Sequence, residues 1–380
     1  MKLLLVSSAF YPKVGGVEKV VEDLAENLSF RHDVCVLSSI TELDKKNIFR
    51  VSSRIEDYKT FKLKRIWMNY PRNFVGAVVF PGRLFLSLVS LIFFARKFKP
   101  DLINLHFPDD VSLYMWVMTL FSKCPLIVNI HGNDLHVFSK KLGYKYFING
   151  LVSKSKKVVV NSQYMKNEFD RRYPRYSRKV EIIANGLDVD AIKKVNPKTY
   201  FSEPYIFYVG RIVHKKGVDI LLKAFKKADF KGCKLVIEGQ GELLNNMEKL
   251  SEDLGLNQSV VFSKGTMSQS DKFAYMKGAV LGVMPSRIEP FGIVALEFMA
   301  AGTPLVASET GGLKYILRNK ETCLFFDNKN ADDLSRKMKE MFSDAKLRAR
   351  LSKRGLEEAS KYDNRKVAKM YENLFLKYDR

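Results

Sequence analysis

The chain alternates between two patterns of apolar and polar positions. Amphipathic stretches separate most of its short apolar runs, which predict strands at 2–7, 33–39, 64–68, 101–105, 125–130, 157–161 and 180–183. In 16–28, apolar residues recur every three or four positions and form one helical stripe: Val17, Val20, Val21, Leu24, Ala25 and Leu28. This alternation predicts a mostly parallel sheet with helices on both faces.

The alternation weakens at about 184–204, which contains Asn185-Gly186, Pro197 and Pro204, and then restarts. Further strands are predicted at 205–210, 233–238, 259–262, 279–284, 304–307 and 323–326, and helices at 216–228, 241–253, 292–301 and 330–342. The segment 345–378 is helical without a strand signal. We therefore expect an α/β protein of two Rossmann-like, doubly wound domains. Since such sheets bind ligands at the carboxyl ends of their strands, we expect the site in a cleft that the two domains face.

Length and charge narrow the function. A chain of 380 residues exceeds the roughly 250–300 residues at which single cores stop growing. The 64 Lys and Arg residues against 41 Asp and Glu give a net charge of +23, which favours nucleic acid, an acidic membrane or phosphorylated substrates as partners. The four cysteines, at 35, 124, 233 and 323, lack zinc or redox spacing and fit a reduced compartment.

Two apolar segments bear on localisation. The start, Lys2 followed by Leu3–Val6, has too few apolar residues for a signal peptide. The longest apolar stretch, 84–95, lies between Arg83 and Arg96 and is shorter than the about 20 residues of a membrane span. We expect a cytoplasmic protein that is soluble or peripheral on the cytoplasmic face of the membrane.

The segment 285–297, Pro-Ser-Arg-Ile-Glu-Pro-Phe-Gly-Ile-Val-Ala-Leu-Glu, follows an apolar run and opens a helix. Gly292 permits close backbone approach, and the first helix amides are unpaired donors suited to a phosphate. Glu289 precedes the helix on the expected cleft side, and Glu297 lies where it could reach a ribose diol. The alternative is an ordinary helix start with solvent-facing acids.

A second segment, Val209-Gly210-Arg211-Ile212-Val213-His214-Lys215-Lys216-Gly217, joins a strand to a helix. Arg211 offers a planar fork to phosphate oxygens and Lys216 a point charge, so the two could hold a diphosphate and stabilise its charge as it leaves. The alternative is solvated surface charge.

In the first half, Gly15-Gly16 opens the first helix and would let the backbone approach a ligand; the alternative is a flexible turn. His131 directly follows the strand 125–130, and His106 ends the preceding strand. Either histidine could bind a sugar or polarise a reacting centre, or could make a structural hydrogen bond.

Two further patterns are weaker evidence of a functional site. Gly239-Gln240-Gly241 resembles a dinucleotide fingerprint, but Leu244 stands where the third glycine should be. Asp188 and Asp190 resemble a metal-binding pair, but they follow Asn185-Gly186, where acids commonly cap turns or helices. We expect no metal site.

Together these residues resemble glycosyltransferase family 4, the retaining GT-B enzymes that use nucleotide sugars. The resemblance covers nearly the whole chain and rests on Pro12–Val17, Asn185–Asp188, Gly210-Arg211 with Lys216-Gly217, the Glu289–Glu297 element, Ala301–Ala307 and Gly311-Gly312. Leu187 stands where the family usually has valine. The resemblance implies an acceptor-binding domain 1–190, completed by the helix 362–380, and a donor-binding domain 191–361.

The resemblance also implies roles. Gly210, Arg211 and Lys216 would bind the donor diphosphate, amides near Gly292, Ile293 and Val294 would cradle its phosphates, and Glu297 would bind the ribose. Glu289 would contact the sugar, while Gly15, Gly16 and His131 would close on the donor from the other domain. His131, Glu289, Arg211 and Lys216 are the catalytic candidates. The donor base is expected to be UDP, then GDP, with no cofactor or metal.

The acceptor is less defined. Positions 140–179 hold twelve basic residues against Glu168 and Asp170, a net 12 − 2 = +10, and 74–95 adds a long apolar region. We expect a glycan or lipid-linked acceptor and association with an anionic membrane; the alternative is a solvated basic face over a packing helix. Rival functions are an epimerase or phosphorylase of the same fold, or a nucleic-acid-binding protein. No nucleic-acid partner is expected, because no such module is visible.

Overall fold

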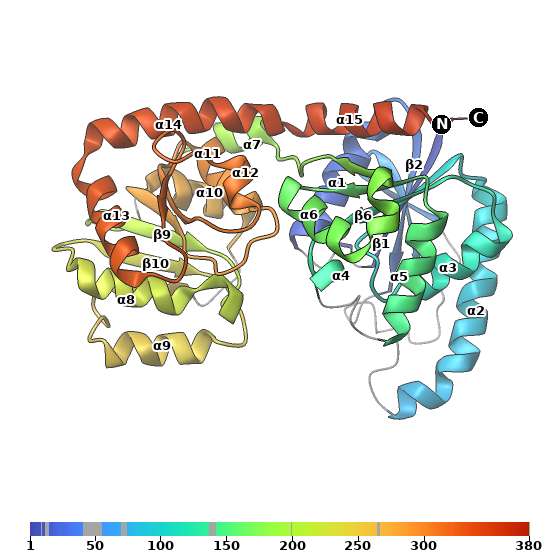
Figure 1. Cartoon of the computed structure of the whole chain (residues 1–380), viewed down its shortest axis with the longest axis horizontal. Coiled ribbons are helices and arrows are strands. Elements are labelled where there is room, and N and C mark those ends of the chain that lie inside the picture. The colour runs from blue at the N-terminus through green and yellow to red at the C-terminus, as the bar shows by residue number, and fades with distance from the viewer. Residues whose placement is uncertain are drawn as a thin grey trace. The chain divides into compact units, whose positions relative to one another are not determined.

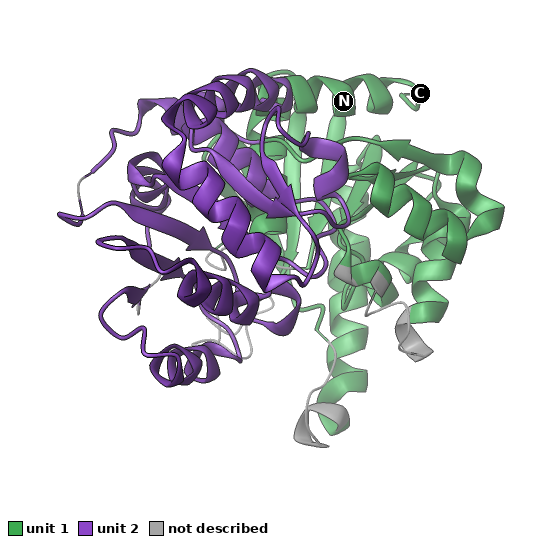
Figure 2. Ribbon diagram, turned by 60° about the vertical axis from the view of Figure 1, so that its left-hand side comes forward, with its two compact units in different colours: residues 1–186, 364–380 green, residues 187–363 purple. Residues whose placement is uncertain are grey.

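The computed structural model of the chain describes residues 1–8, 10–11, 15–40, 55–69, 74–136, 142–198, 200–263 and 267–379. It divides into two compact units (Figure 2): unit 1 comprises Met1–Gly186 and Asn364–Arg380, and unit 2 comprises Leu187–Asp363. The boundaries expected from sequence, 190/191 and 361/362, lie four and two residues from these divisions.

Unit 1 is built on an eight-stranded sheet with the order β3-β4-β2-β1-β5-β6-β7-β8. Every neighbouring pair is parallel except β3 with β4. The strands are β1 (Lys2–Ser7), β2 (Asp33–Ser39), β3 (Ile55–Tyr58), β4 (Phe61–Ile66), β5 (Leu102–His106), β6 (Leu126–Ile130), β7 (Lys157–Val160) and β8 (Val180–Ile182). The helices are α1 (Gly16–Ser29), α2 (Phe74–Phe98), α3 (Ser112–Phe121), α4 (Asn133–His136), α5 (Leu142–Lys154), α6 (Gln163–Arg172), the 3-10 helix η3 (Pro174–Lys179) and α15 (Asn364–Leu376) (Figure 1).

The central strands of unit 1 are apolar on both faces, as a parallel sheet covered on both sides requires. Leu4 and Val6 of β1 face a core shared with α2, α3, α5 and α6. Leu3 and Leu5 face a second core, to which α1 and α15 contribute. Thus α2 and α1 cover opposite faces of the sheet, and the last helix of the chain belongs to unit 1.

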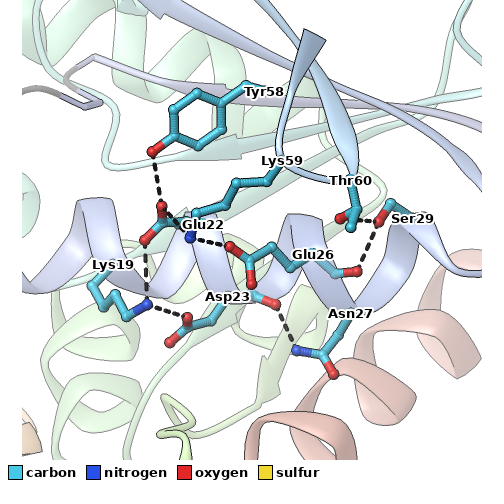
Figure 3. A network of polar contacts seen from close by, with 9 residues as sticks. All are labelled: Lys19, Glu22, Asp23, Glu26, Asn27, Ser29, Tyr58, Lys59 and Thr60. Carbon is cyan, nitrogen blue, oxygen red and sulfur yellow. Dashed lines mark hydrogen bonds and ion pairs between the residues drawn. The ribbon is translucent and has the colours of Figure 1, made fainter.

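A polar network fastens the β3–β4 hairpin to α1 (Figure 3). Glu22 accepts a hydrogen bond from the Tyr58 hydroxyl at 3.0 Å and pairs with Lys59 at 2.9 Å. Lys59 also pairs with Glu26, and the Ser29 hydroxyl donates to Thr60 at 2.7 Å. This network fixes the helix whose first residue is the candidate Gly16.

The apolar region around 84–95 extends into a longer helix than its sequence pattern predicts. α2 has 25 residues and includes Pro81 and both arginines that bound the apolar run, Arg83 and Arg96. Among the described residues, one helical segment, Val78–Phe98, is long and apolar enough to cross a membrane by length and composition. The expectation that this segment is too short for a membrane span is therefore wrong by length, because the apolar helix continues past both arginines.

Unit 2 is built on a six-stranded, fully parallel sheet with the order β11-β10-β9-β12-β13-β14. Its strands are β9 (Tyr205–Val209), β10 (Lys234–Glu238), β11 (Val260–Ser263), β12 (Leu281–Met284), β13 (Leu305–Ser308) and β14 (Leu324–Phe326). Its helices are α7 (Val189–Lys194), η4 (His214–Lys216), α8 (Val218–Ala228), α9 (Leu244–Asp253), α10 (Gln269–Gly278), α11 (Ile293–Ala301), α12 (Leu313–Ile316), α13 (Ala331–Ser343), α14 (Ala345–Ala359) and η5 (Ser360–Tyr362).

Each sheet has a point where the strand order reverses. In unit 1 the chain runs outward from β1 to β2 and later returns to place β5 on the other side of β1. In unit 2 it runs from β9 to β10 and β11, and then places β12 beside β9. Ligands of open α/β sheets bind at such switch points, outside the carboxyl ends of the strands. The loops after β1 and β5, and those after β9 and β12, are therefore where each unit would hold a ligand.

Candidate functional site

In unit 2 the loops after β9 and β12 are held together through their backbones. Gly217 has a φ of +67°, and a Cβ there would lie 2.1 Å from the carbonyl oxygen of Pro285. The amide of Arg287 donates to the carbonyl oxygen of Lys215 at 2.8 Å. Since only glycine tolerates both the left-handed conformation and this approach, Gly217 fixes the spacing of the two loops.

Arg287 adds a side-chain brace to the same pair of loops. Its guanidinium donates two hydrogen bonds to the carboxylate of Asp219 on α8, at 2.8 and 2.7 Å, and one to the carbonyl oxygen of His214. Burial alone would raise the pKa of Asp219, but the hydrogen bonds and positive charge of Arg287 hold that pKa below its ordinary value. A bidentate pair of this kind is rigid as well as attractive.

The braced loops bring Lys216 and Glu289 together. Their side chains form an ion pair with an Nζ–Oε2 distance of 2.5 Å, and both are largely buried. The Ser286 hydroxyl donates to the same carboxylate oxygen at 3.3 Å. Thus two of the four catalytic candidates lie in direct contact, 73 positions apart in the sequence.

Gly311-Gly312 supports the Glu289 loop from behind. The amide of Gly312 donates to the carbonyl oxygen of Glu289 at 2.7 Å. A Cβ on Gly311 would lie 2.2 Å from that oxygen, and one on Gly312 would lie 2.3 Å from the carbonyl oxygen of Pro290. This glycine pair is therefore explained by close backbone packing.

The N-terminus of α11 presents free backbone donors beside this ion pair. Gly292 precedes the helix with a φ of +104°. In the part of the chain that the structure describes, the amides of Gly292, Ile293 and Val294 have no acceptor, whereas that of Ala295 donates to the carbonyl oxygen of Gly292. Unpaired amides and the helix dipole together suit an anion.

Positive charge gathers on the loop after β9. Arg211 is exposed, and its guanidinium has no partner among the described residues. Burial first, and then the charges of Arg211 and Lys216, lower the pKa of Lys215, against the opposing effect of Glu289. Arg211, Lys215 and Lys216 repel one another, so a polyanionic ligand bound beside them would lower the electrostatic free energy of this loop.

Glu297 lies in the second turn of α11 and pairs with Lys272 on α10 at 2.6 Å. Both side chains are largely buried. The other carboxylate oxygen, Oε2, is buried and accepts no hydrogen bond from any residue that the structure describes. Buried acceptors without a donor are uncommon, so this oxygen is positioned to receive a hydroxyl group of a ligand.

Gly210 and the Gly239-Gln240-Gly241 segment belong to one packing feature. A Cβ on Gly239 would lie 1.9 Å from the carbonyl oxygen of Gly210, and one on Gly241 would lie 2.2 Å from that of Ile212. The amide of Ile212 donates to the carbonyl oxygen of Gln240 at 2.9 Å. The glycines that resemble a dinucleotide fingerprint thus set the course of the Arg211 loop.

In unit 1, Gly15 and Gly16 stand at the start of α1. Gly15 has an extended conformation with a φ of −159°, so it is not a left-handed position. A Cβ on Gly16 would meet nothing within 4 Å. The fold of unit 1 therefore leaves open space at Gly16, as close approach of a ligand would require.

His131 belongs to a chain of buried polar groups. Its Nε2 lies 3.2 Å from Nδ1 of His106, whose Nε2 lies 2.6 Å from Oδ1 of Asn104. The Asn104 oxygen can only accept, so His106 carries its proton on Nε2 and its Nδ1 is an acceptor. His131 must therefore donate to that Nδ1 through its own Nε2. The Nδ1 of His131 is then an acceptor without a proton, and it is buried with no partner among the described residues.

Burial determines the charge of these groups. It lowers the pKa of His131 to about 4 and that of His106 well below its usual value, with His131 adding to the latter shift. Burial raises the pKa of Asp134 to about 6, although three amides donate to its carboxylate. His131 is thus a neutral hydrogen-bonding group near neutral pH and does not act as a cation.

Asp109, in the loop after β5, was not identified from the sequence. Burial and then the neighbouring Asp110 raise its pKa to about 7, against hydrogen bonds from Ser8 and the Val111 amide. Its Oδ1 is buried without a partner. From the sequence alone, a single aspartate after a strand looks the same whether it is buried in a site or exposed in a solvated loop.

The basic stretch 140–179 is distributed over several elements of unit 1. Of its twelve cations, Lys140 and Lys141 lie outside the described residues, Lys156 lies between α5 and β7, and the others lie on α5, β7, α6 and η3. Lys179 donates to the carbonyl oxygens of Val152, Ser153 and Ser155 at the end of α5. Two more cations are paired on α6, Lys166 with Asp170 and Arg171 with Glu168. The alternative of an ordinary basic face gains weight for this segment.

The candidates therefore form two groups. The structure gathers Gly210, Arg211, Lys216, Glu289, Gly292, Ile293, Val294 and Glu297 on the loops after β9 and β12 and on α11. It places Gly15, Gly16 and His131 at the carboxyl edge of the unit 1 sheet, with His106 between them on β5. Pro12–Val14 of the first motif lie outside the described residues. Among the described residues, no cluster of three His, Cys, Asp or Glu side chains could hold a metal, and metal independence remains a prediction.

Two neighbouring family models match the chain. The model of the group 1 glycosyl transferases matches residues 190–358, and that of glycosyltransferase family 4 matches residues 14–191. A Methanocaldococcus jannaschii protein described as an uncharacterized glycosyltransferase is 27% identical over 98% of each chain. The glycogen synthase of Mycobacterium tuberculosis is 26% identical, covering 99% of this chain and 94% of that protein.

Solved structures show the same architecture. The sucrose-phosphate synthase from Thermosynechococcus elongatus superposes with a TM-score of 0.80 at 21% identity, covering 99% of this chain and 98% of the other. The Anabaena protein HepE, in complex with UDP and glucose, also gives a TM-score of 0.80, at 18% identity over 99% and 100% of the two chains. The fold is therefore that of the GT-B enzymes. The chain belongs to glycosyltransferase family 4 and is a glycosyltransferase.

Proposed function

We propose that this enzyme transfers a hexose or N-acetylhexosamine from a nucleotide diphosphate sugar to a glycan or lipid-linked acceptor, as a step in the synthesis of a cell-surface polysaccharide or glycolipid. The observation that carries the proposal is the Lys216–Glu289 pair, together with the Arg211 side chain and the Gly292–Val294 amides, for which the described residues offer no partner. This arrangement offers cations and backbone donors to a diphosphate, and Glu289 to the sugar attached to it.

UDP is the favoured base, followed by GDP. The HepE structures contain UDP, UDP with glucose, or UDP-glucose. In this chain, the unsatisfied Oε2 of Glu297 would accept a ribose hydroxyl, which any of these nucleotides carries. A binding screen is therefore needed to identify the base and the sugar of the donor.

The proposed chemistry proceeds with retention at the anomeric carbon. Retention through a covalent intermediate needs a carboxylate nucleophile, but Glu289 is already held by Lys216 and Ser286. A front-face path fits better: the leaving phosphate oxygen takes the proton of the acceptor hydroxyl while Arg211 and Lys216 stabilise the separating charge. With cations in that role no metal is required, and full activity in the presence of a chelator would support this part of the proposal.

The neutral His131 fits a hydroxyl group of the sugar or acceptor. Its Nδ1 can accept a hydrogen bond, and the pKa of about 4 keeps it unprotonated across the cytoplasmic pH range. The acceptor class rests on this neutral environment and on the family. A Rhizobium meliloti relative described as a lipopolysaccharide core biosynthesis glycosyltransferase is 32% identical over 48% of this chain and 53% of that protein. We place the enzyme in the cytoplasm or on the cytoplasmic face of the membrane.

The test is a thermal-shift screen of UDP, GDP and ADP and their sugar conjugates. A ligand that binds only the folded protein raises its stability by mass action. We expect one nucleotide to stabilise the wild type, and Arg211→Ala and Glu297→Gln each to lose most of that shift. Glu252→Gln on α9 is the matched control, since it removes an exposed glutamate from the same unit and should leave the shift unchanged.

Three outcomes would contradict the proposal. If no nucleotide stabilises the wild type at millimolar concentration, unit 2 does not hold the donor as assigned. If the sugar conjugate is converted without any acceptor, the enzyme is an epimerase. If the product anomer is inverted when its configuration is read by NMR, the front-face mechanism is wrong.

A further inference from the structure

One apolar helical face of unit 1 is exposed and is not covered by any other element that the structure describes. On α2, the residues Val78, Val79, Phe85, Leu86, Val89 and Phe93 are exposed, with Phe93 at 71% and Phe85 at 66%. At about 100° per residue these positions fall within a stripe about 120° wide, so they form one side of the helix, called here the outer face. Monomeric soluble proteins rarely expose so continuous an apolar surface.

The opposite side of α2 is fixed to the fold. Leu91, Phe94 and Phe98 are buried in the core shared with the sheet, and Leu84 and Leu88 pack against it. The helix is also the connection between β4 and β5, two strands of one sheet. A helix that crossed a bilayer would separate the ends of these strands, so in this fold α2 cannot span a membrane despite its sufficient length.

The charged side chains of α2 itself are all basic. Residues 59–100 contain no Asp or Glu, and Arg83, Arg96 and Lys97 lie on α2 itself. Arg96 and Lys97 occupy its last turn, where they are exposed. Arg83 lies over the ring of Trp67 at 5.3 Å. An apolar helical face edged by cations complements an anionic lipid surface, into which such faces sink by about 5–10 Å.

The length of α2 carries its start beyond the strands of the sheet. Its 25 residues extend about 38 Å, whereas the six residues of β4 extend about 20 Å. α2 follows the carboxyl end of β4, and the lower end of the cyan helix reaches past the strands in Figure 1. Val78 and Val79 lie in the second turn of α2, and Gly16 and His131 follow strands at the same carboxyl edge.

We propose that the outer face of α2 docks unit 1 on an anionic bilayer, with the helix lying in the plane of the interface. This inference deepens the lipid-linked part of the proposed function by naming the surface that meets the membrane. It replaces the basic stretch 140–179 as the expected contact. Vesicle binding needs no sugar donor, so the two proposals can fail separately.

The experiment is flotation of the full-length protein with preformed vesicles of phosphatidylcholine, with and without phosphatidylglycerol. The wild type should float with the anionic vesicles and be released by alkaline carbonate, as a peripheral protein is. The double variant Phe85→Ser/Phe93→Ser should lower binding at least about tenfold, because two large apolar side chains are lost from the interface. Phe30→Ser is the matched control: Phe30 is 76% exposed, at the end of α1 on the opposite face of the sheet, and its loss should change nothing.

Sedimentation of the same proteins without lipid separates the other occupants of this face. A wild type that is monomeric and binds anionic vesicles supports the proposal. A wild-type dimer that Phe85→Ser/Phe93→Ser dissociates, with no vesicle binding, shows that a second copy covers α2 and overturns it. Equal vesicle binding by the wild type and the double variant also overturns it, and so does loss of binding in Phe30→Ser. A cooperative thermal unfolding transition in the absence of any ligand shows that each variant is folded.

Discussion

The switch points of the two sheets hold opposite kinds of polar chemistry. In unit 2 the side chains are charged and paired: Lys216 with Glu289, Arg287 with Asp219 and Lys272 with Glu297. In unit 1, burial moves the pKa of each polar group towards its neutral form, in His106, His131, Asp109 and Asp134 alike. The switch point therefore holds charged ion pairs in unit 2, whereas in unit 1 it favours the uncharged forms of its side chains.

The difference matches what each unit would bind. A diphosphate brings charge, so its site must supply cations and free amides held at fixed spacing, as the loops of unit 2 do. Hydroxyl groups of a sugar or acceptor bring none, and the neutral imidazole of His131 can accept a hydrogen bond from them. Three substitutions test this contrast, in order of decreasing expected effect.

The charged site of unit 2 is most sensitive at Lys216. In Lys216→Ala the leaving diphosphate loses a cation and Glu289 keeps an unpaired buried charge, so we expect kcat/KM to fall by about 10²–10³-fold. Steady-state kinetics with the nucleotide sugar found by the screen would measure this. Lys227→Ala removes an exposed lysine of the same unit, which pairs with Asp332 across the surface, and should retain full activity. A loss of less than threefold (about 0.6 kcal/mol) in Lys216→Ala would show that this lysine does not face the reaction.

The neutral environment of unit 1 is tested at Asp109. Its pKa in the folded state is about 7, against about 3.9 unfolded, so the folded state binds the extra proton between these values. Stability should accordingly decline as pH rises from about 4 to about 7. Asp109→Asn removes the cost of ionising this buried carboxyl. We expect its free energy of unfolding to exceed that of the wild type by about 2 kcal/mol above about pH 7, and to equal it below about pH 4.

Unfolding of unit 1 can be followed selectively, because both tryptophans, Trp67 and Trp116, belong to it. Urea titrations at several pH values, read by tryptophan fluorescence, would give the difference curve. Asp253→Asn, an exposed substitution on α9 of unit 2, controls for the loss of one negative charge. A difference between Asp109→Asn and the wild type that does not vary with pH would contradict burial as the cause.

The smallest effect on the fold should come from Gly16→Ala. The added methyl group meets no atom of unit 1 within 4 Å, so stability should be unchanged or up to about 1 kcal/mol higher. If the donor approaches the start of α1, the same methyl group should weaken its binding about tenfold or more. Calorimetric titration would measure this against Gly82→Ala, which also enters open space on a helix of unit 1. Equal donor affinity in both variants would remove Gly16 from the site.

Much of this fold follows from the sequence pattern. The predicted strands of both sheets agree with the observed ones to within three residues at each end, since their buried apolar runs are short and continuous. The prediction missed β3, whose residues Ile55–Tyr58 form a mostly exposed edge strand with no apolar run. It also missed α10, in which Ala274 and Met276 are the buried residues and no apolar stripe forms.

The site was predictable only as a set of loops. Glycine and charge motifs indicated the segments 209–217 and 285–297, but which charges would pair depended on the fold. Lys272 pairs with Glu297 from a helix that the pattern did not reveal. The relay from Asn104 through His106 to His131 depends on neighbouring strands placing their ends side by side. Side chains that act through such long-range neighbours leave no local signal in the chain.

The return of the chain to unit 1 has a consequence for biosynthesis. Val367, Tyr371 and Phe375 of α15 complete a core begun by Leu3 and Leu5, and the Tyr371 hydroxyl donates to Oδ1 of Asn129 at 2.8 Å. Between the two parts lie the residues of unit 2, 363 − 187 + 1 = 177 in number. At about 5–20 residues per second, a ribosome needs roughly 10 to 35 seconds to translate them. During that interval one face of the first sheet is covered by α1 without α15, so the unit that is synthesised first is completed last.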